Sequence, residues 1–485
     1  MAIPHLSLAM ALIPFFAGPA WSAPPATAAL PVSLKVIQIS PANGAANACT
    51  DTPLHVLFSA PPALAKSGAI QFLDDTGAVI DSIDASAPTR RKSIGGLPNF
   101  NDCPILLDGN EATIAFNNNL LAYGKTYHIK ITGSPFTDPQ GHPIDLPADW
   151  HFTTRPQPPA LPADAPRRIT ISADGSSDFA TLQGALDSIP ENNTTPTTLF
   201  LRNGTYHEIV YASAKHNLTI LGEDRQKTIL AYPNNQNLNN TDRPAMPGGY
   251  RRGMFRAVNC RDLTLANLTF HNTTPQGGSQ AEAIILNGGP DAHAILTRLD
   301  LQSFQDTLQI NGQAYISDCQ IDGDVDFMWG TGPVFFENCT CRALRRNAFY
   351  TQIRNTAATH GFIYDHCLFE GATGVTGCLL SRIDPSRFPS SEVVLLNCTL
   401  TSAVSDIAWR FDNFSNPAPT PNVHFWESNS TGPDAKPIDD SHRFPASQRL
   451  SNDKDAGTIA HYADPKWVLG GSWSPILPPD LFPKH

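Results

Sequence analysis

Charged side chains are scarce in this sequence of 485 residues, and basic ones are the scarcer kind. Only 16% of the residues are charged, with 44 acidic against 33 basic side chains and a formal net charge of −11. No basic stripe occurs, which argues against a nucleic-acid partner. After the first thirty residues no apolar run approaches the roughly 18 residues that a membrane-spanning helix needs. We therefore expect no membrane partner.

Cysteine pairs with zinc spacing are also lacking. The nine cysteines include no CxxC pair, which argues against a metal site. Cys49 and Cys103 are the only two in the N-terminal third, and an exported chain could join them in a disulfide. Five others follow a polar residue in a common setting, which favours core packing because free Cys is among the most buried residue types. These are Asn259-Cys260, Asp318-Cys319, Asn338-Cys339, His366-Cys367 and Asn397-Cys398.

The first thirty residues resemble a secretory signal. An apolar run from Leu6 to Phe16 is followed by small, Ala-rich sequence, the order typical of such signals. We expect residues 1–28 to be a signal peptide. The mature protein would then be secreted, or periplasmic if the source is a Gram-negative bacterium.

Residues 31–154 have the pattern of a small all-β domain. Short β-type runs separated by turn clusters predict a β-sandwich; examples are Leu34–Ile39, Leu54–Phe58 and Thr126–Ile131. The phrases Ile39–Gly44 and Phe136–Gly141 resemble those of bacterial Ig-like domains, which often precede exported catalytic domains. The Pro-rich residues 155–167 are predicted to be a semi-rigid linker.

Residues 168–478 have a different residue pattern from the N-terminal part. Short runs rich in Ile, Leu, Phe and Thr alternate with Asn, Gly and Asp. The cysteine settings recur at 319, 339, 367 and 398, intervals of 20, 28 and 31 residues. Irregular periods of this length predict a coil of parallel strands with variable loops. The helical stretch Leu182–Ile189 would cap the first coil.

Two aspartates stand out in this second part. Asp306 and Asp326 lie among apolar residues and glycine, where a buried charge is costly unless a site needs it. They are 326 − 306 = 20 residues apart, about one coil, so adjacent strands would bring the carboxylates within about 5 Å. Two carboxyl groups that close do not both ionise easily. One proton donor beside one nucleophile or base is the minimum equipment for ester hydrolysis.

Six motifs in order resemble the pectin methylesterase (pectinesterase) family of carbohydrate esterases. They are Asp174–Leu182, Gly204–Glu208, Gln280–Ala283, Gln305–Leu308, Asp324–Gly330 and Phe425–Pro433. The resemblance implies an all-β fold, a right-handed parallel β-helix preceded by the Ig-like β-sandwich. It also implies a hydrolase that converts pectin and water to pectate and methanol, without a metal or organic cofactor. The expected partner is pectin, and the expected state is a monomer.

The resemblance also implies the site residues. Asp326 would be the nucleophile and Asp306 the general acid and base. Gln305 and Gln280 would stabilise the oxyanion, and Arg382 would orient Asp326. Among the aromatics, substrate stacking is expected for Phe327, Trp329 and Trp409.

Departures from the family pattern keep other functions open. The family's LGRPW occurs as Leu380–Asp384, so the arginine is retained, but Ile383 and Asp384 replace its Pro-Trp pair. Gln309 stands where an aromatic residue usually follows the QDTL motif. One alternative is an esterase or thioesterase of the same superfamily acting on another acyl substrate. The other is a non-catalytic β-solenoid that binds polysaccharide.

Overall fold

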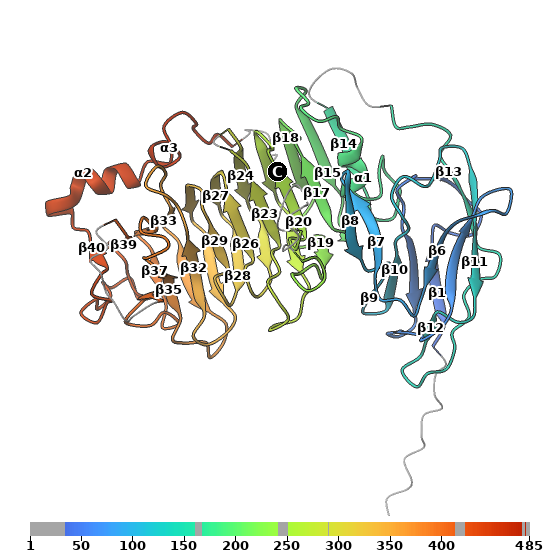
Figure 1. Ribbon diagram of the computed structural model, residues 1–485, viewed down its shortest axis with the longest axis horizontal. Coiled ribbons are helices and arrows are strands. Elements are labelled where there is room, and N and C mark those ends of the chain that lie inside the picture. Colours follow the sequence, from blue (N-terminus) through green and yellow to red (C-terminus); the bar gives the residue numbers. More distant parts are fainter. Residues whose placement is uncertain are drawn as a thin grey trace, which may run out of the picture.

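A computed structural model of the protein describes residues 34–160, 167–240, 251–289, 291–412, 422–477 and 481. The expected signal peptide lies outside these residues, as do residues 161–166 of the expected linker. Two bodies follow each other along the chain, a β-sandwich and a long solenoid (Figure 1). None of the helices in the described ranges is long and apolar enough to cross a membrane.

The N-terminal body has its own core between two main sheets. Along β3 (Leu54–Phe58), alternate residues Leu54, Val56 and Phe58 are buried in this core, as expected where one face of a strand packs and the other does not. One sheet has the order β1-β3-β10-β9 and the other β2-β13-β11-β5-β6; a β4-β12 pair and a β7-β8 hairpin complete the described strands. The remaining bounds are β1 Val36–Ser40, β2 Ala45–Ala48, β4 Ala63–Leu64, β5 Ala69–Leu73, β6 Val79–Asp84, β7 Arg90–Ile94, β8 Leu97–Asp102, β9 Ile105–Asp108, β10 Glu111–Ile114, β11 Thr126–Thr132, β12 Phe136–Thr137 and β13 His151–Thr154. The β-sandwich prediction is confirmed.

The second body is the predicted β-helix, and its strands form three long parallel sheets in the described residues. From β15 to β38 the chain visits the first, second and third sheet in turn, so each coil in this range adds one strand to each sheet. The first sheet contains β14 Arg167–Ile171, β15 Thr197–Leu201, β18 Leu218–Gly222, β21 Leu263–Ala266, β24 His293–Thr297, β27 Gln313–Ser317, β30 Val334–Glu337, β33 Phe362–Asp365, β36 Glu392–Leu396, β39 His424–Ser428 and β40 Gln448–Arg449. The second contains β16 Gly204–Tyr206, β19 Thr228–Tyr232, β22 Thr269–Asn272, β25 Asp300–Gln302, β28 Gln320–Gly323, β31 Thr340–Ala343, β34 Leu368–Gly371 and β37 Thr399–Leu400. The third contains β17 Val210–Ser213, β20 Phe255–Val258, β23 Ile284–Asn287, β26 Leu308–Asn311, β29 Met328–Gly330, β32 Phe349–Ile353, β35 Leu379–Ile383 and β38 Trp409–Phe411.

Apolar side chains stack on one another from coil to coil inside the solenoid, which explains the recurring apolar runs in the sequence. One column of residues in register along the first sheet is fully buried from coil to coil. Its members are Leu199, Ile220, Leu265, Leu296, Ile316, Phe336, Tyr364 and Leu395. Burial of such aliphatic and aromatic side chains contributes about 1.5–3 kcal/mol each, so the column is a main source of stability.

The recurring Asn and Asp before cysteine are corner residues. At the turn after each first-sheet strand from β21 to β39, one residue has left-handed backbone, with φ between +51° and +59°, and Asn and Asp adopt that conformation more readily than most residues. These are Asn267, Arg298, Asp318, Asn338, His366, Asn397 and Asn429. The cysteines that follow four of them are buried in the core. Cys260 lies at a different corner, after the third sheet.

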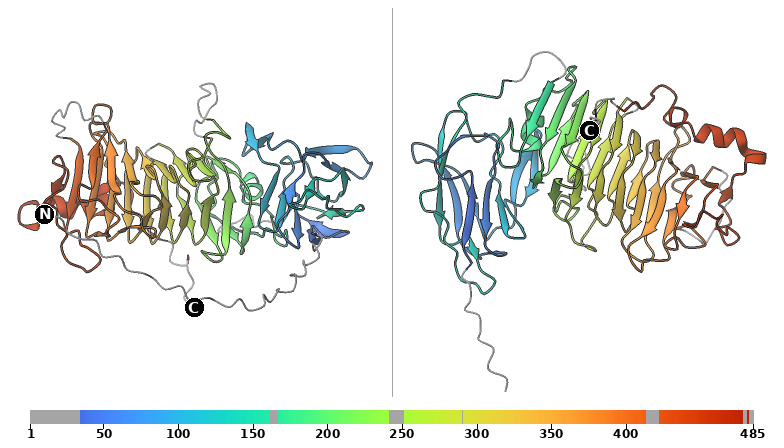
Figure 2. Two further views of the ribbon diagram at one scale, coloured as in Figure 1. Left: turned by 90° about the horizontal axis from the view of Figure 1, so that it is seen from below. Right: turned by 180° about the vertical axis from the view of Figure 1, so that it is seen from behind.

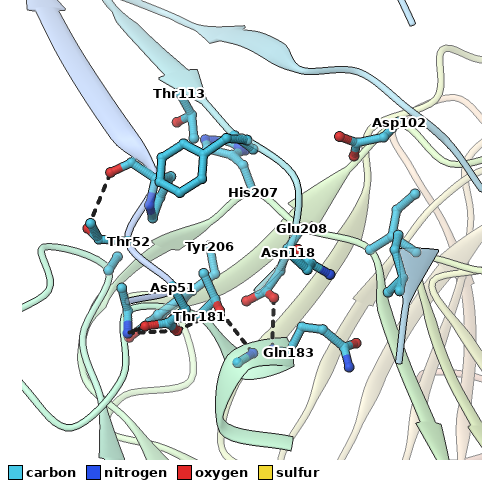
Figure 3. A pocket seen from close by; sticks show the side chains of 18 of the residues that line it. Asp51, Thr52, Asp102, Thr113, Asn118, Thr181, Gln183, Tyr206, His207 and Glu208 are labelled. Carbon is cyan, nitrogen blue, oxygen red and sulfur yellow. Dashed lines mark hydrogen bonds between the residues drawn. The ribbon is translucent and has the colours of Figure 1, made fainter. Parts of the chain in front are cut away.

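Helix α1 (Leu182–Asp187) lies at the first coil, as predicted, and joins the two bodies. Asp51 of the N-terminal body accepts hydrogen bonds from the backbone N–H groups of Ala180 (3.1 Å) and Thr181 (2.8 Å). Glu208 of the solenoid accepts from Leu182 (2.7 Å) and Gln183 (2.9 Å). Both carboxylates therefore meet at the start of α1, in a cavity between the two bodies (Figure 3).

The β7-β8 hairpin reaches from the N-terminal body onto the solenoid. Its Ile94 and Phe100 belong to the same hydrophobic cluster as the solenoid interior. Beside them, the backbone N–H of Asn101 donates to Oδ1 of Asn239 at 2.8 Å. The sandwich therefore packs against one end of the coil, opposite the end that bears α2 (Asn452–Tyr462) and α3 (Pro465–Val468) (Figure 2).

The possible disulfide between Cys49 and Cys103 is not formed. All nine thiols are free. Sγ of Cys49 lies 3.3 Å from the carbonyl oxygen of Gly175 in the solenoid, because the residues before β3 face the domain junction. Burial raises the pKa of Cys49 to about 12, so this thiol stays protonated.

Candidate active site

Asp306 and Asp326 lie at the same corner of consecutive coils. Gln305 and Val325 form a parallel β-bridge, and the backbone N–H of Asp306 donates to the carbonyl oxygen of Val325 at 3.0 Å. Strands in adjacent coils are about 4.8 Å apart, so the two aspartates are neighbours, as their separation predicts. Both have left-handed backbone, with φ of +66° and +47°, and each is only 8% exposed.

Asp326 is held by a guanidinium and an amide from the next two coils. Arg382 on β35 donates from Nε to Oδ1 at 2.9 Å and from Nη2 to Oδ2 at 2.6 Å. Nε2 of Gln352 on β32 donates to Oδ2 at 3.2 Å. The guanidinium of Arg382 in turn lies 4.2 Å above the ring of Phe349. A two-point contact between a guanidinium and a carboxylate is a strong, directional interaction, so this carboxylate is fixed in orientation.

Asp306 faces a second ion pair, formed by two residues that precede it in the sequence. Nη2 of Arg252 donates to Oδ2 of Asp306 at 2.9 Å. The same guanidinium binds Glu282, with Nε at 2.9 Å from each carboxylate oxygen and Nη2 at 2.7 Å from Oε1. Glu282 is fully buried and Arg252 nearly so. Asp306 thus has a carboxylate on either side, Glu282 and Asp326.

The surroundings separate the protonation of the two aspartates. Burial raises the pKa of Asp306 well above its usual value, the charge of Glu282 raises it further, and Arg252 opposes both. Burial also raises the pKa of Asp326, but the hydrogen bonds and charge of Arg382 act against it. Coupled carboxyl groups lose their protons in two steps. Because Asp326 has its own guanidinium, it ionises first and Asp306 keeps the proton.

The two glutamines expected at the oxyanion are on consecutive coils next to the aspartates. The backbone N–H of Ala281 donates to the carbonyl oxygen of Gln305 at 3.1 Å, which places Gln280 and Gln305 side by side. Their separation of 305 − 280 = 25 residues predicts this placement. Both side chains are half-buried, so their amides are accessible to a bound molecule.

The three aromatic residues expected to stack on sugars are not equivalent. Phe327 is fully buried and packs on Tyr350, with ring centroids 5.3 Å apart. Trp409 is also fully buried; its Nε1 donates to Glu427 at 3.0 Å. Neither ring has a face for a ligand, so we withdraw the substrate-binding prediction for both. Each follows a residue with left-handed backbone, which turns the next side chain inward.

Trp329 lies beside the aspartates instead of in the solenoid interior. It is 4% exposed, because two arginines cover it. The guanidinium of Arg354 is 4.8 Å and that of Arg252 is 5.6 Å from its ring. Trp329 therefore supports the cations of the site through ring contacts, and it offers a sugar little surface.

The structure accounts for Ile383 and Asp384, two of the three residues that depart from the family's motifs, but not for Gln309. Ile383 is 1% exposed and belongs to the core cluster, so it replaces an apolar residue with another. Asp384 accepts a hydrogen bond from the backbone N–H of Ser386 at 3.0 Å and begins a turn. Gln309 is buried in register between Ile285 and Trp329, and nothing in the structure explains why an amide is needed there.

Sequence reasoning missed the ion pair at Asp306. Arg252 lies 306 − 252 = 54 residues before it in a segment without a recognised motif. Glu282 lies inside the Gln280–Ala283 motif, where a charge flanked by alanines is a signal that could have been used.

Comparison with known proteins agrees with this architecture. A family model described as pectinesterase matches residues 168–460, and one described as a bacterial Ig-like domain matches residues 31–154. Pectinesterase 31 of Arabidopsis thaliana is 28% identical over 303 residues, which cover 61% of this chain and 92% of the relative. Probable pectinesterase 50 of the same species is 30% identical over 336 residues, which cover 67% and 85%.

A solved structure with the same fold is the pectin methylesterase from carrot. It superposes with a TM-score of 0.54 at 20% identity and covers 62% of this chain and 93% of its own. At this identity the likeness concerns the fold, the stack of parallel strands (Figure 2).

Proposed function

The chain belongs to the pectinesterase family, and we propose that it hydrolyses the methyl esters of pectin through a covalent aspartyl intermediate. The observation that carries this proposal is the asymmetric pair of neighbouring aspartates. Asp326 is bound at two points by Arg382, whereas Asp306 lies between two other carboxylates. One group is thus prepared to attack and the other to donate a proton.

In the first half of the reaction, an oxygen of ionised Asp326 attacks the ester carbonyl carbon of a galacturonate residue. The amides of Gln280 and Gln305 donate hydrogen bonds to the oxyanion that forms. Asp306 gives its proton to the departing methoxy oxygen, so methanol leaves and an anhydride joins Asp326 to the sugar.

In the second half, ionised Asp306 takes a proton from a water molecule that attacks the same carbon. The bond to Asp326 breaks and Asp326 leaves as a carboxylate, which restores the nucleophile. The sum is one ester and one water converted to one acid and one methanol. Arg382 keeps Asp326 ionised and aligned in both halves.

The test is methanol release from highly methylated pectin across a pH range, with wild type compared with Asp326→Asn. We expect loss of turnover in the variant, with an unchanged circular dichroism spectrum. Asp318→Asn is a matched control, because Asp318 is also a corner aspartate with left-handed backbone (φ +53°) but is exposed and remote from the site. Turnover by Asp326→Asn at the wild-type rate would refute the assigned nucleophile.

A related acyl substrate is the second candidate. Asp384 in place of the tryptophan of the family's LGRPW motif favours it, because an added carboxylate repels an acidic polysaccharide. Release of thiol from an acyl thioester, with no methanol from pectin and with dependence on Asp326, would establish this alternative and exclude pectin. Pectin affinity without hydrolysis of either substrate would point to a binding protein.

We also propose that the protein acts outside the cytoplasm as a monomer. The apolar N-terminal run supports export. Sequencing the N-terminus of protein recovered outside the cells, and light scattering of that protein, test the two statements.

A further inference from the structure

Arg252 poses a problem for the chemistry assigned to Asp306. A guanidinium that donates to a carboxyl group favours the ionised form, but an acid that protonates the leaving methanol has to be neutral when the reaction begins. Nη2 of Arg252 is 2.9 Å from Oδ2 of Asp306. An unaccompanied arginine in this place would remove the proton that the step requires.

Glu282 supplies the missing charge. Its side chain is fully buried, and it accepts from both Nε and Nη2 of Arg252. The pair is therefore close to neutral as seen from Asp306. Burying such a pair costs several kcal/mol of desolvation per ion, and the attraction offsets that cost only when the geometry is good. The contacts of 2.7–2.9 Å meet that condition, and the same guanidinium also donates to Asp306, so the pair is placed to act on this carboxyl group.

The backbone that carries Arg252 is also fixed. Nδ2 of Asn234 donates to the carbonyl oxygens of Arg251 at 2.8 Å and Gly253 at 2.7 Å, one on each side of Arg252. Asn234 is fully buried. At Gly253 a Cβ atom would lie 2.7 Å from the side chain of Ile285, so glycine allows this segment to approach the third sheet.

We propose that Glu282 and Arg252 are positioning residues for Asp306: Glu282 fixes the guanidinium and offsets its charge, so that Arg252 can orient Asp306 while Asp306 still carries the proton for the leaving group. This rests on the proposed function. Because Oδ2 accepts from Arg252, the proton of neutral Asp306 belongs on Oδ1. Once the proton has been given away, the same N–H stabilises the carboxylate that activates water.

The charged groups that face Asp306 come from several coils, and each enters the expectation. Burial is the largest cause of the raised pKa of Asp306; Glu282 and Asp326 raise it further, whereas Arg252 and Arg354 lower it. Glu282→Gln removes one of the two raising charges and leaves Arg252 uncompensated. The pKa of Asp306 then falls, and with it the pH above which the general acid is lost.

The first readout is the pH dependence of kcat/KM for methanol release. The alkaline limb is the pH range in which kcat/KM falls because Asp306 loses its proton, and the acidic limb is the range in which it falls because Asp326 gains one. In Glu282→Gln we expect the alkaline limb to move down by at least about one pH unit, which is a tenfold loss of rate just below the wild-type limb. The acidic limb should stay in place. The double variant Arg252→Met/Glu282→Leu, which removes both charges, should return the limb towards the wild type. Apolar replacement of a buried pair is often tolerated, which keeps the test open if the single variant is unstable.

Glu427→Gln is the matched control. Glu427 is nearly buried and accepts from Nε of Arg443 at 2.8 Å, so this variant breaks a comparable pair away from Asp306. It should lower stability without moving the limb. An unmoved limb in Glu282→Gln, or an equal shift in Glu427→Gln, would overturn the proposal.

A second readout separates this inference from the proposed function. Infrared difference spectra titrate the protonated carboxyl of Asp306 directly, with its band assigned by its loss in Asp306→Asn. If the wild type releases no methanol, the proposed function fails, and the titration still decides whether Glu282 keeps Asp306 protonated. A titration midpoint of Asp306 that is the same in wild type and Glu282→Gln would refute the positioning role.

Discussion

Replacing Arg382 with methionine should convert Asp326 from a ready nucleophile into one that ionises only at higher pH. Hydrogen bonds to charged groups contribute about 1.5–3 kcal/mol each. Arg382 makes two to Asp326 and its side chain is 24% exposed. Water screens such a pair in part, so we take the lower value, about 3 kcal/mol in total. At about 1.4 kcal/mol per pKa unit, the pKa of Asp326 should rise by about two units.

The consequence for the rate follows from the role of Asp326. Because only the ionised form attacks, the acidic limb of kcat/KM should move up by about two pH units. At a pH below the wild-type limb, kcat/KM should be about 100-fold lower than in the wild type, and between the two limbs this deficit should shrink about tenfold with each added pH unit. Methanol release measured in half-unit steps of pH resolves this shift.

Arg410→Met is the matched control for this change. Arg410 is in register with Arg382 on the next strand, but its Nη2 binds Asp412 at 3.0 Å and not Asp326. Its replacement should leave the acidic limb in place. If Arg382→Met kept the wild-type limb, or lost activity equally at every pH, the guanidinium would not be what keeps Asp326 ionised.

Two further predictions concern stability. Burial raises the pKa of Glu208 from 4.5 to about 7. Because the folded state binds this proton more tightly than the unfolded state, its contribution to the free energy of unfolding is complete below pH 4.5 and is lost as the pH rises through 7. The loss amounts to at most about 3 kcal/mol. Urea unfolding at pH 4.5 and 8 should therefore show a smaller decrease for Glu208→Gln than for the wild type, and equal decreases would contradict the assignment. Trp409→Ala should cost about 3–5 kcal/mol with an unchanged KM for pectin, because the ring is fully buried; a raised KM in the folded variant would restore its substrate role.

The parts of the site that sequence could predict are those set by distance along the chain. Coils of similar length put residues 20 or 25 positions apart on neighbouring strands, so the pairs Asp306–Asp326 and Gln280–Gln305 could be placed without coordinates. The contact between Arg382 and Asp326 was expected from the family resemblance. Its strength depends on the bidentate geometry, which only the structure describes.

The sequence could not predict the direction in which side chains point at the turns between sheets. Phe327 and Trp409 come directly after residues with φ of +47° and +53°, and a left-handed residue interrupts the alternation of inward and outward side chains. Arg252 was missed for a different reason. Residues 251–254 lie beside Glu282 of the next coil, where the backbone N–H of Met254 donates to the carbonyl oxygen of Glu282 at 2.8 Å, and no motif or periodic pattern in the sequence marks this segment.

The hairpin β7-β8 has a consequence for the solenoid as an assembly of strands. A parallel β-helix ends in unpaired backbone N–H and C=O groups, which are a template for joining a second molecule end to end. Here a Cβ atom on Gly95 of the hairpin turn would lie 2.3 Å from the carbonyl oxygen of Tyr211 on β17, so the hairpin lies directly against a strand of the first coil. Repeat proteins need such end caps to remain separate in solution. The hairpin of the Ig-like domain therefore covers part of the first coil that would otherwise be open to another chain.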